Sequence, residues 1–183
     1  MTTVLGIAGS TRRHSFNHAL LRAAAAAAPP GINIELASIG GIPLYNADHE
    51  KEHGLPEPVV QLKERVAAAD ALLLATPEYN NSIPGVFKNT LDWLTRPPKD
   101  ISKLFHDKPV ALMGASPGRG GTRMAQLAWL QILRTLSTRP WFGKQLYVAH
   151  AGSVFDESGE LIDDGVRQQL ADFLAGFAAF VAS

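Results

Sequence analysis

Five short apolar segments alternate along the chain with segments in which apolar residues recur every three to four positions. Apolar runs of this length, without regular polar alternation, are typical of strands buried on both faces of a parallel sheet. The predicted strands are Val4–Ala8, Ile32–Leu36, Asp70–Thr76, Pro109–Gly114 and Gln145–His150. The periodic segments predict amphipathic helices over residues 15–28, 59–69, 85–95 and 122–136, and a last one from about residue 163.

This order of elements predicts an α/β fold, because strand–helix alternation builds a parallel sheet through right-handed crossover connections. Five such units favour a flavodoxin-like three-layer sandwich, with a five-stranded parallel sheet of order 2-1-3-4-5 and helices on both faces. Residues 43–58 have no clear period and are expected to form a long polar loop. Since no linker or repeat interrupts the alternation, we expect a single domain over residues 1–183.

Composition and charge narrow the classes of partner. Lysine plus arginine and aspartate plus glutamate both number 17, so the formal net charge is zero and no global basic field attracts nucleic acid. The chain has no cysteine, which removes disulfides, thiolate metal sites and cysteine nucleophiles together and fits a reducing compartment. No window approaches the roughly 18 uncharged apolar residues of a membrane span, and no cationic segment precedes the first apolar run. We therefore expect a cytoplasmic protein without membrane or nucleic-acid partners.

Ligands of such folds bind at the carboxyl ends of the strands, where the strand order reverses. The loop after the first strand, residues 9–17, brings hydroxyl groups, an amide and two arginines to a helix N-terminus, a combination suited to a phosphate. A helix cap at Ser15 is the alternative, but a cap needs neither Arg12 nor Arg13, whose charges oppose the helix dipole. Because G-x-G-x-x-G and the P-loop motif are both absent, a phosphomonoester such as flavin mononucleotide is favoured over a dinucleotide or triphosphate.

The loops after the third and fourth strands also have unusual composition. Residues 76–85 place a glutamate, a tyrosine and two asparagines between apolar elements, which suits an aromatic ring with a polar edge; a turn braced by prolines is the alternative. Residues 114–121 are rich in glycine, so their backbone can approach a flat ligand closely. A flexible connection explains this last loop equally well.

The glycine-rich loop also matches G-x-S-x-G, the nucleophile motif of α/β-hydrolases, with Ser116 as the nucleophile. That reaction class is disfavoured, because the residue after the nucleophile must donate its N–H to the oxyanion and Pro117 has none. No acidic residue lies between Ser116 and His150, the last histidine of the chain. His49 and His53 have the spacing of a metal pair on a helix, but they lie in the expected polar loop, so no metal site is predicted.

Together the loops give the sequence a resemblance to the NADPH-dependent FMN reductase family, a flavodoxin-like group that includes chromate reductases, quinone reductases and some azoreductases. The matching stretches are GSTRRHSFN (9–17), IPLYNAD (42–48), PEYNNSIPGVFKNTLDWLTRP (77–97) and SPGRGG (116–121), and FDESGELID (155–163) matches more weakly. Two positions depart from the family pattern: Thr11 replaces a commonly apolar residue, and Arg119 replaces a small or apolar one.

The resemblance implies which residues hold FMN. The phosphate and ribityl end would be bound by Ser10, Arg12, Ser15, Phe16 and Asn17. The isoalloxazine would be lined by Pro77, Glu78, Tyr79, Asn80, Asn81 and Ser82. The other side of the ring would be closed by Ser116, Pro117, Gly118, Arg119, Gly120 and Gly121.

The implied reaction transfers two electrons from NADPH or NADH through bound FMN to an acceptor such as a quinone, an azo compound, chromate or free flavin. The flavin carries the chemistry, so no side chain is expected to be catalytic, and loop N–H groups near residues 116–121 would stabilise negative charge on it. Two alternatives stay open, a flavodoxin-like one-electron carrier and a flavin-binding module without turnover. Flavodoxins are usually strongly acidic, so the zero net charge disfavours the carrier.

The helix expected over residues 122–136 has apolar residues on two faces. One face contains Ala128, Trp129, Ile132, Leu133 and Leu136. The opposite face contains Leu127 and Leu130, among Arg123, Gln126 and Arg134. One face would pack on the sheet and the other on a second copy of the chain, so we expect a homodimer or homotetramer, as is common in the family.

Overall fold

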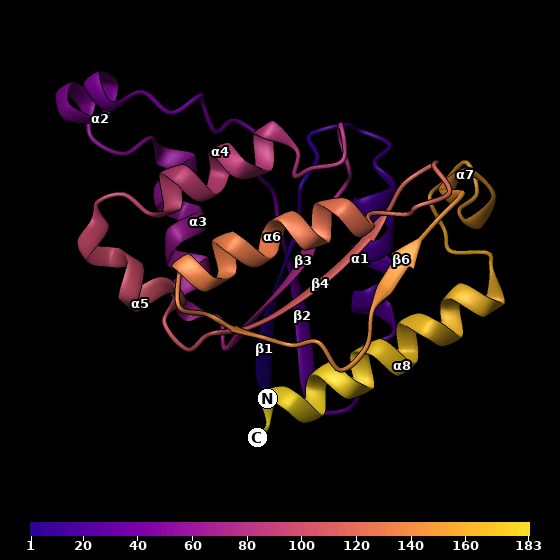
Figure 1. Ribbon diagram of the computed structural model, residues 1–183. Helices are drawn as coiled ribbons and strands as arrows, with labels where there is room; N and C mark the ends of the chain where they lie inside the picture. The colour runs from indigo at the N-terminus through magenta and orange to yellow at the C-terminus, as the bar shows by residue number, and fades with distance from the viewer.

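A parallel sheet between two layers of helices forms the body of the protein, and the computed structural model describes all 183 residues (Figure 1). The strands are β1 (Thr2–Ala8), β2 (Ile32–Ala37), β3 (Ala71–Ala75), β4 (Pro109–Ala115), β5 (Arg139–Pro140) and β6 (Leu146–Val148). Their order is β2-β1-β3-β4-β5, β6 also pairs with β4, and every pairing is parallel. The predicted flavodoxin-like fold and its 2-1-3-4-5 order are confirmed.

The fifth position of the sheet is filled by two short strands, where the sequence predicted one strand at residues 145–150. β5 pairs with the start of β4, and β6 pairs with its end. Between them the Trp141 N–H still donates to Val110 O at 2.8 Å, while its side chain packs on α8 (Asp164–Val181), with its ring centroid 5.0 Å from that of Phe173. The pairing with β4 stops after this bond and resumes at Leu146.

The five predicted helices are present, and their ends differ from the prediction by a few residues. They are α1 (Phe16–Ala26), α3 (Glu57–Ala68), α4 (Gly85–Leu94), α6 (Arg123–Thr135) and α8. The structure adds α2 (Ala47–His53), α5 (Ile101–Phe105), α7 (Ala151–Val154) and a 3₁₀ turn (Pro98–Asp100). These elements span seven residues or fewer, too few for a recognisable apolar period. None of the helices combines the length and the apolar composition that a membrane crossing needs.

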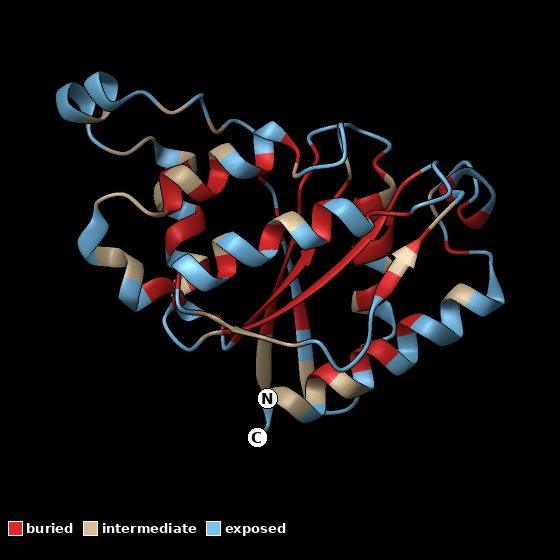
Figure 2. Cartoon of the chain, in the orientation of Figure 1, coloured by how far each residue is buried: buried red, intermediate tan, exposed pale blue.

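The sheet separates two apolar cores. Alternate side chains of β3 point to opposite faces: Leu73 joins the core that α1 and α8 cover, whereas Leu72 and Leu74 join the core that α3, α4, α5 and α6 cover. Figure 2 shows the central strands buried along most of their length. Helices on both faces explain why the strand sequences show no polar alternation.

The two faces of α6 agree with the prediction except at one residue. Trp129 and Leu133 are buried, whereas Leu127 and Leu130 are 55% and 37% exposed. Gln126 was expected on the outer face and is buried, so that assignment is wrong. Its Nε2 donates to the side chain of Thr122 at 3.0 Å and to the Leu146 carbonyl at 3.1 Å, which satisfies the amide inside the protein.

Residues 43–56, which we call the arm, project at one end of the molecule (Figure 1). The expectation of a structureless polar loop is wrong here, because the arm contains α2, which is capped by the side chain of Asn46. No residue of α2 is buried (Figure 2). The base of the arm is held by α4, since the Pro43 carbonyl accepts hydrogen bonds of 2.8 Å from Asn89 Nδ2 and Trp93 Nε1.

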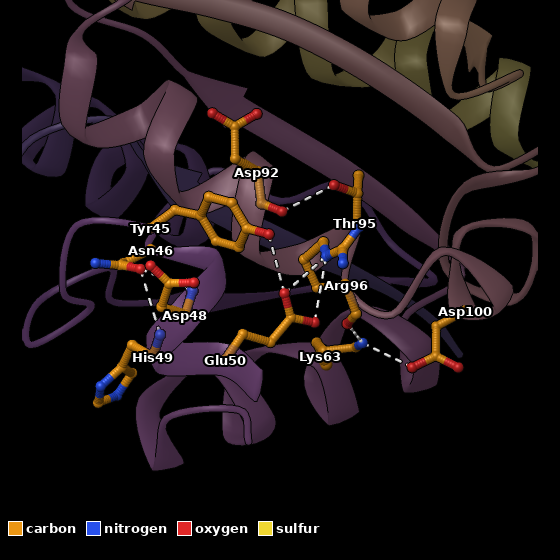
Figure 3. Close-up of polar contacts among 10 residues, drawn as sticks. All are labelled: Tyr45, Asn46, Asp48, His49, Glu50, Lys63, Asp92, Thr95, Arg96 and Asp100. Carbon is orange, nitrogen blue, oxygen red and sulfur yellow. Dashed lines mark hydrogen bonds and ion pairs between the residues drawn. The ribbon is translucent and has the colours of Figure 1, made fainter. Parts of the chain in front are cut away.

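An ion pair around Glu50 ties the arm to the end of α4 (Figure 3). Arg96 Nε donates to Glu50 Oε2 at 2.9 Å, and the Tyr45 hydroxyl donates to the same oxygen at 3.0 Å. Burial raises the pKa of Glu50, but the hydrogen bonds from Arg96 and Tyr45 outweigh burial and hold the pKa below its usual value. Lys63 extends the cluster, because its Nζ donates to the Arg96 carbonyl and to Asp100 Oδ2.

Replacing Glu50 with glutamine should destabilise the protein near neutral pH. A carboxyl group whose pKa is lowered by folding stabilises the protein above its unfolded pKa, and this stabilisation is lost as the pH falls through the folded pKa. We expect E50Q to lower the Tm by about 2 to 4 °C near pH 7, and the difference from wild type to shrink as the pH falls below about 4. Thermal unfolding followed by circular dichroism over this pH range measures both effects.

Glu52 offers a matched control for this prediction. It lies on the same helix with a side chain that is 69% exposed, and its contact with His53 is 4.0 Å long. Glu52→Gln should therefore leave the Tm unchanged at every pH. A deficit of E50Q that stays constant down to about pH 3 would contradict the role assigned to the carboxylate charge.

Candidate functional site

Three loops meet at the carboxyl edge of the sheet. The parallel ladder continues one residue beyond β1 and β3, because Gly9 N donates to Ala75 O and Thr76 N donates to Met113 O, each at 2.9 Å. The chain then leaves the sheet in loop 1 (residues 9–15), loop 2 (residues 76–84) and loop 3 (residues 116–122). The strand order reverses at this edge, since β1 has β2 on one side and β3 on the other.

A cleft of about 190 Å³, the edge cleft, lies between the three loops. It is lined by Ser10, Arg12, Ser15, Phe16, Asn17, Pro77, Glu78, Tyr79, Ala115, Ser116 and Pro117. The structure therefore brings together residues that were predicted separately on three loops. The lining does not include Asn80, Asn81, Ser82, Gly118, Arg119, Gly120 and Gly121, which were predicted with them.

The two serines of loop 1 shape its backbone. Ser15 is the N-cap of α1, with its Oγ accepting from His18 N at 3.4 Å, and Ser10 Oγ accepts from Arg12 N at 3.2 Å. His18 also fixes this loop, because its Nε2 lies 2.8 Å from the Ser10 carbonyl. His18 was not among the residues predicted for the site from the sequence. Its position three residues after the capping serine is the signal that could have identified it.

A cation of loop 1 and two donors at the start of α1 have no partner within the chain. The N–H groups of Phe16 and Asn17 have no acceptor within the chain. The Arg12 guanidinium lies 5.1 Å from the centre of the Phe16 ring and forms no ion pair with a carboxylate. These groups stand at the N-terminus of an 11-residue helix, whose dipole favours negative charge. The arrangement is suited to binding a phosphate.

Loop 2 contains a tight turn. Tyr79 N donates to Ser82 O at 3.1 Å and Ser82 N donates to Tyr79 O at 3.0 Å, while Asn80 and Asn81 between them have φ angles of 50° and 57°. Two consecutive residues with positive φ are the mark of a type I′ turn, which asparagine tolerates better than most residues. The two asparagines therefore have a conformational reason to be present. Tyr79, which is 52% exposed, lies on the wall of the edge cleft.

Glu78 connects loop 2 to the helix that follows loop 3. Its Oε2 accepts hydrogen bonds from Met124 N at 2.8 Å and from Ala125 N at 3.0 Å, in the first turn of α6. Thr122, the N-cap residue of α6, makes no side-chain capping bond. Glu78 therefore takes the place of the missing capping side chain, although it comes from another loop. Its carboxylate also places a negative charge at the positive end of the helix dipole. One carboxylate oxygen thus fixes two walls of the cleft relative to each other.

Loop 3 combines a fixed inner part with an open outer part. Ser116 Oγ donates to the Gly121 carbonyl at 2.5 Å. Its hydroxyl proton is therefore used inside the loop, and no histidine accepts it, as a serine nucleophile would require. The N–H groups of Gly118, Arg119 and Gly120 have no acceptor within the chain, and a side chain at Gly120 would meet no atom within 4 Å. A flat ligand has room against this backbone.

A second cleft, of about 410 Å³, adjoins the edge cleft and shares Arg12, Ser15 and Phe16 with it. Its other side is the turn at residues 155–159, and the ring of Phe155 stacks on Phe16 with centroids 6.0 Å apart. The position of this turn beside loop 1 was not predicted, because the two segments are far apart in sequence and no local pattern links them.

The histidine pair considered for a metal lies elsewhere. His49 and His53 are on the exposed helix α2, and their rings stack with centroids 4.6 Å apart. No group of three or more histidine, aspartate or glutamate side chains in the structure is arranged to hold a metal ion.

The fold and the edge cleft define a flavodoxin-like α/β protein with a cationic loop at the reversal of its strand order. The chain belongs to the NADPH-dependent FMN reductase family, whose sequence model matches residues 2–153. It is 45% identical over 178 residues to an NAD(P)H-dependent FMN reductase of Pseudomonas aeruginosa, a match that covers 97% of this chain and 94% of the relative. It is 38% identical over 181 residues to a 2-hydroxy-1,4-benzoquinone reductase of a Burkholderia species, covering 96% and 93%.

A solved structure supports the same conclusion. The flavoenzyme NAD(P)H:(acceptor) oxidoreductase of Paracoccus denitrificans matches with a TM-score of 0.87 and 32% sequence identity, covering 100% of this chain and 98% of that one. The protein is therefore an oxidoreductase that depends on FMN and NAD(P)H, as the sequence analysis predicted.

Proposed function

We propose that the protein binds FMN in the edge cleft and transfers two electrons from NAD(P)H to a quinone. The observation that carries this proposal is the convergence of three loops with complementary chemistry. Loop 1 offers Arg12 and free N–H groups for an anion, while loops 2 and 3 offer an aromatic ring and free N–H groups for a flat polar ligand. The relatives whose names record FMN and quinone reduction support the same assignment.

The donors of the edge cleft fit the two ends of FMN. The phosphate end is assigned to Ser10, Arg12, Ser15 and Phe16, where a guanidinium and unpaired N–H groups lie at a helix N-terminus. The ring is assigned to the space between Tyr79 and the outer part of loop 3. Pro77 and Pro117, which have no N–H of their own, contribute apolar surface to the walls beside the ring.

When bound, FMN would supply the redox chemistry, which is hydride transfer from NAD(P)H and delivery of two electrons to the acceptor. The residues of the chain bind and orient. The N–H groups of Gly118, Arg119 and Gly120 are free to stabilise negative charge at the edge of the ring. Because the Tyr79 side of the cleft is half exposed, NAD(P)H and the acceptor can occupy the same open face in turn.

A quinone is the acceptor that the relatives favour, and azo compounds, chromate and free flavin are assigned as further acceptors of the same open face. The alternatives are a one-electron carrier and a flavin-binding module without turnover. Both of these would bind FMN without reacting with NAD(P)H.

We place the protein in the cytoplasm, on the ground that a chain without cysteine fits a reducing compartment.

The visible spectrum of the protein with one equivalent of FMN tests the proposal. We expect a bound-flavin spectrum that bleaches when NADPH or NADH is added without oxygen and recovers when a benzoquinone is added. Bound FMN that neither nucleotide bleaches would favour the carrier or the binding module. A protein that binds no flavin would contradict the assignment of all three loops.

Replacing Arg12 with glutamine tests the phosphate end. The change removes a charge-assisted contact to the phosphate, so the Kd for FMN should rise about tenfold to a hundredfold, while the Kd for riboflavin, which has no phosphate, should stay close to wild type. Fluorescence titration measures both constants. Arg13→Gln is the matched control, because Arg13 lines the second cleft and not the edge cleft. Equal effects of the two variants would indicate a general charge effect.

We also propose that the protein assembles into a homodimer or homotetramer through the outer face of α6. Met124, Leu127 and Leu130 on this helix are 49%, 55% and 37% exposed, and Phe142 next to the sheet edge is 60% exposed. Leu127, Leu130 and Phe142 line one shallow groove, so the apolar surface is continuous. A continuous exposed apolar surface of this kind is a mark of a contact with another chain.

Sedimentation velocity at micromolar concentration tests this assembly. We expect the wild-type protein to sediment as a dimer or tetramer and the double variant Leu127→Glu with Leu130→Glu to sediment as a smaller species, because two charges would be buried in the contact. Ile162→Glu is the control, since Ile162 is 54% exposed and lies outside this groove. A monomeric wild-type protein would refute the proposal.

A further inference from the structure

Asn17 makes a contact that the proposed function does not explain. The residue is only 2% exposed, its Nδ2 donates to the Ala115 carbonyl, and its Oδ1 accepts from the Ala115 N–H, both at 2.9 Å. Both polar atoms of one side chain are thus bonded to both main-chain groups of one residue, the last of β4. A carboxamide is suited to this task because it carries a donor and an acceptor side by side, as a peptide group does.

The end of β3 explains why Ala115 needs this partner. Successive residues of a strand direct their main-chain groups to alternate neighbours, and Ser116 N donates to β6 at Val148, so the groups of Ala115 face the side of β3. On that side the last bond runs from Thr76 N to Met113 O, and no main-chain group of the chain beyond Thr76 bonds to Ala115. Asn17 therefore takes the place that a further residue of β3 would have.

This pair of bonds joins two loops that the sheet does not join. β1 and β4 are not neighbours, because β3 lies between them. Asn17 is in the first turn of α1, directly after loop 1, whereas Ala115 directly precedes loop 3. The contact between residues 98 positions apart therefore sets how far loop 1 lies from loop 3.

We propose that Asn17 is a positioning residue that sets the separation between the loop for the FMN phosphate and the loop for the ring, and that its side chain does not bind the phosphate. The inference rests on the proposed function, in which one FMN molecule contacts both loops. Such a ligand binds well only when both loops are held within about 0.5 Å of the right geometry. Asn17 thus affects the affinity for whole FMN, and it does not affect the affinity for a ligand that contacts only one of the two loops.

Three ligands separate these roles in the full-length protein freed of bound flavin. FMN spans both loops, lumiflavin carries only the ring, and inorganic phosphate carries only the anion. We titrate wild type and Asn17→Ala with FMN and lumiflavin by fluorescence, and compete phosphate against FMN. The variant should weaken FMN about tenfold and change the lumiflavin Kd and the phosphate Ki by less than about twofold.

Each other pattern overturns the proposal. If Asn17 binds the phosphate, the variant weakens inorganic phosphate as much as FMN. Equal weakening of all three ligands would indicate general damage to the cleft, and an unchanged FMN Kd would indicate no role in binding. A wild-type protein that binds neither FMN nor lumiflavin refutes the proposed function itself, and this result is distinct because it involves no variant.

A second variant and a control complete the test. Asn17→Leu keeps the branched shape of the side chain without a charge and has neither donor nor acceptor for Ala115, so it should show the same pattern even if the alanine variant does not fold. Asn89 is the matched control, because its Oδ1 accepts from Tyr45 N and its Nδ2 donates to Pro43 O, both at 2.8 Å, at the base of the arm. Asn89→Ala removes the same kind of reciprocal pair and should leave all three affinities unchanged.

Discussion

Buried main-chain groups must find partners where the strands of the sheet separate, and this constraint shapes the carboxyl edge of the protein. Helices cover both faces of the sheet, so water cannot replace a missing ladder partner in its interior. An unpaired buried donor or acceptor costs about 1 to 3 kcal/mol. β3 has to end before β4 for a cleft to open between their loops, and Ala115 then loses its neighbour. The amide of Asn17 removes this cost and lets the cleft exist.

The same rule separates the groups that build the edge cleft from the groups that face it. Ser15, Glu78 and Ser116 each use their side-chain oxygen on a main-chain group nearby, and these bonds hold loops 1, 2 and 3 in place. Groups left without a partner include the Arg12 guanidinium and the N–H groups at the start of α1, and beside the cleft those in the outer part of loop 3. These groups are cationic or are donors, so they are suited to an electron-rich ligand.

The sequence allowed the fold to be predicted because the signals behind it are local. A run such as Ala71–Ala75 needs only its own composition to indicate a buried parallel strand. The errors arose where distant contacts decide the structure. In the arm, α2 is anchored because Glu50 pairs with Arg96, 46 residues away. Gln126 is buried because the Leu146 carbonyl receives its amide.

In the candidate site, too, contacts between distant residues could not be predicted from the sequence. The three loops could be predicted from composition and strand order, since parallel strands deliver their carboxyl ends to one edge. The partner of Asn17 is the main chain of an alanine, which leaves no trace in the sequence. Nothing at Ala115 distinguishes it from other alanines until β3 is seen to end beside it.

The hydrogen bonds of the motif residues show what each of these residues does in the structure. Glu78 caps α6, while Asn80 and Asn81 form a turn that few other residues tolerate. The stretch PEYNNS therefore identifies the family largely through residues that fix the backbone, and the same holds for Asn17 in GSTRRHSFN. A motif can mark a binding site because its residues build the site, without each residue touching the ligand. In this protein the hydrogen-bond partners of each side chain separate the two roles, and the sequence letters alone do not.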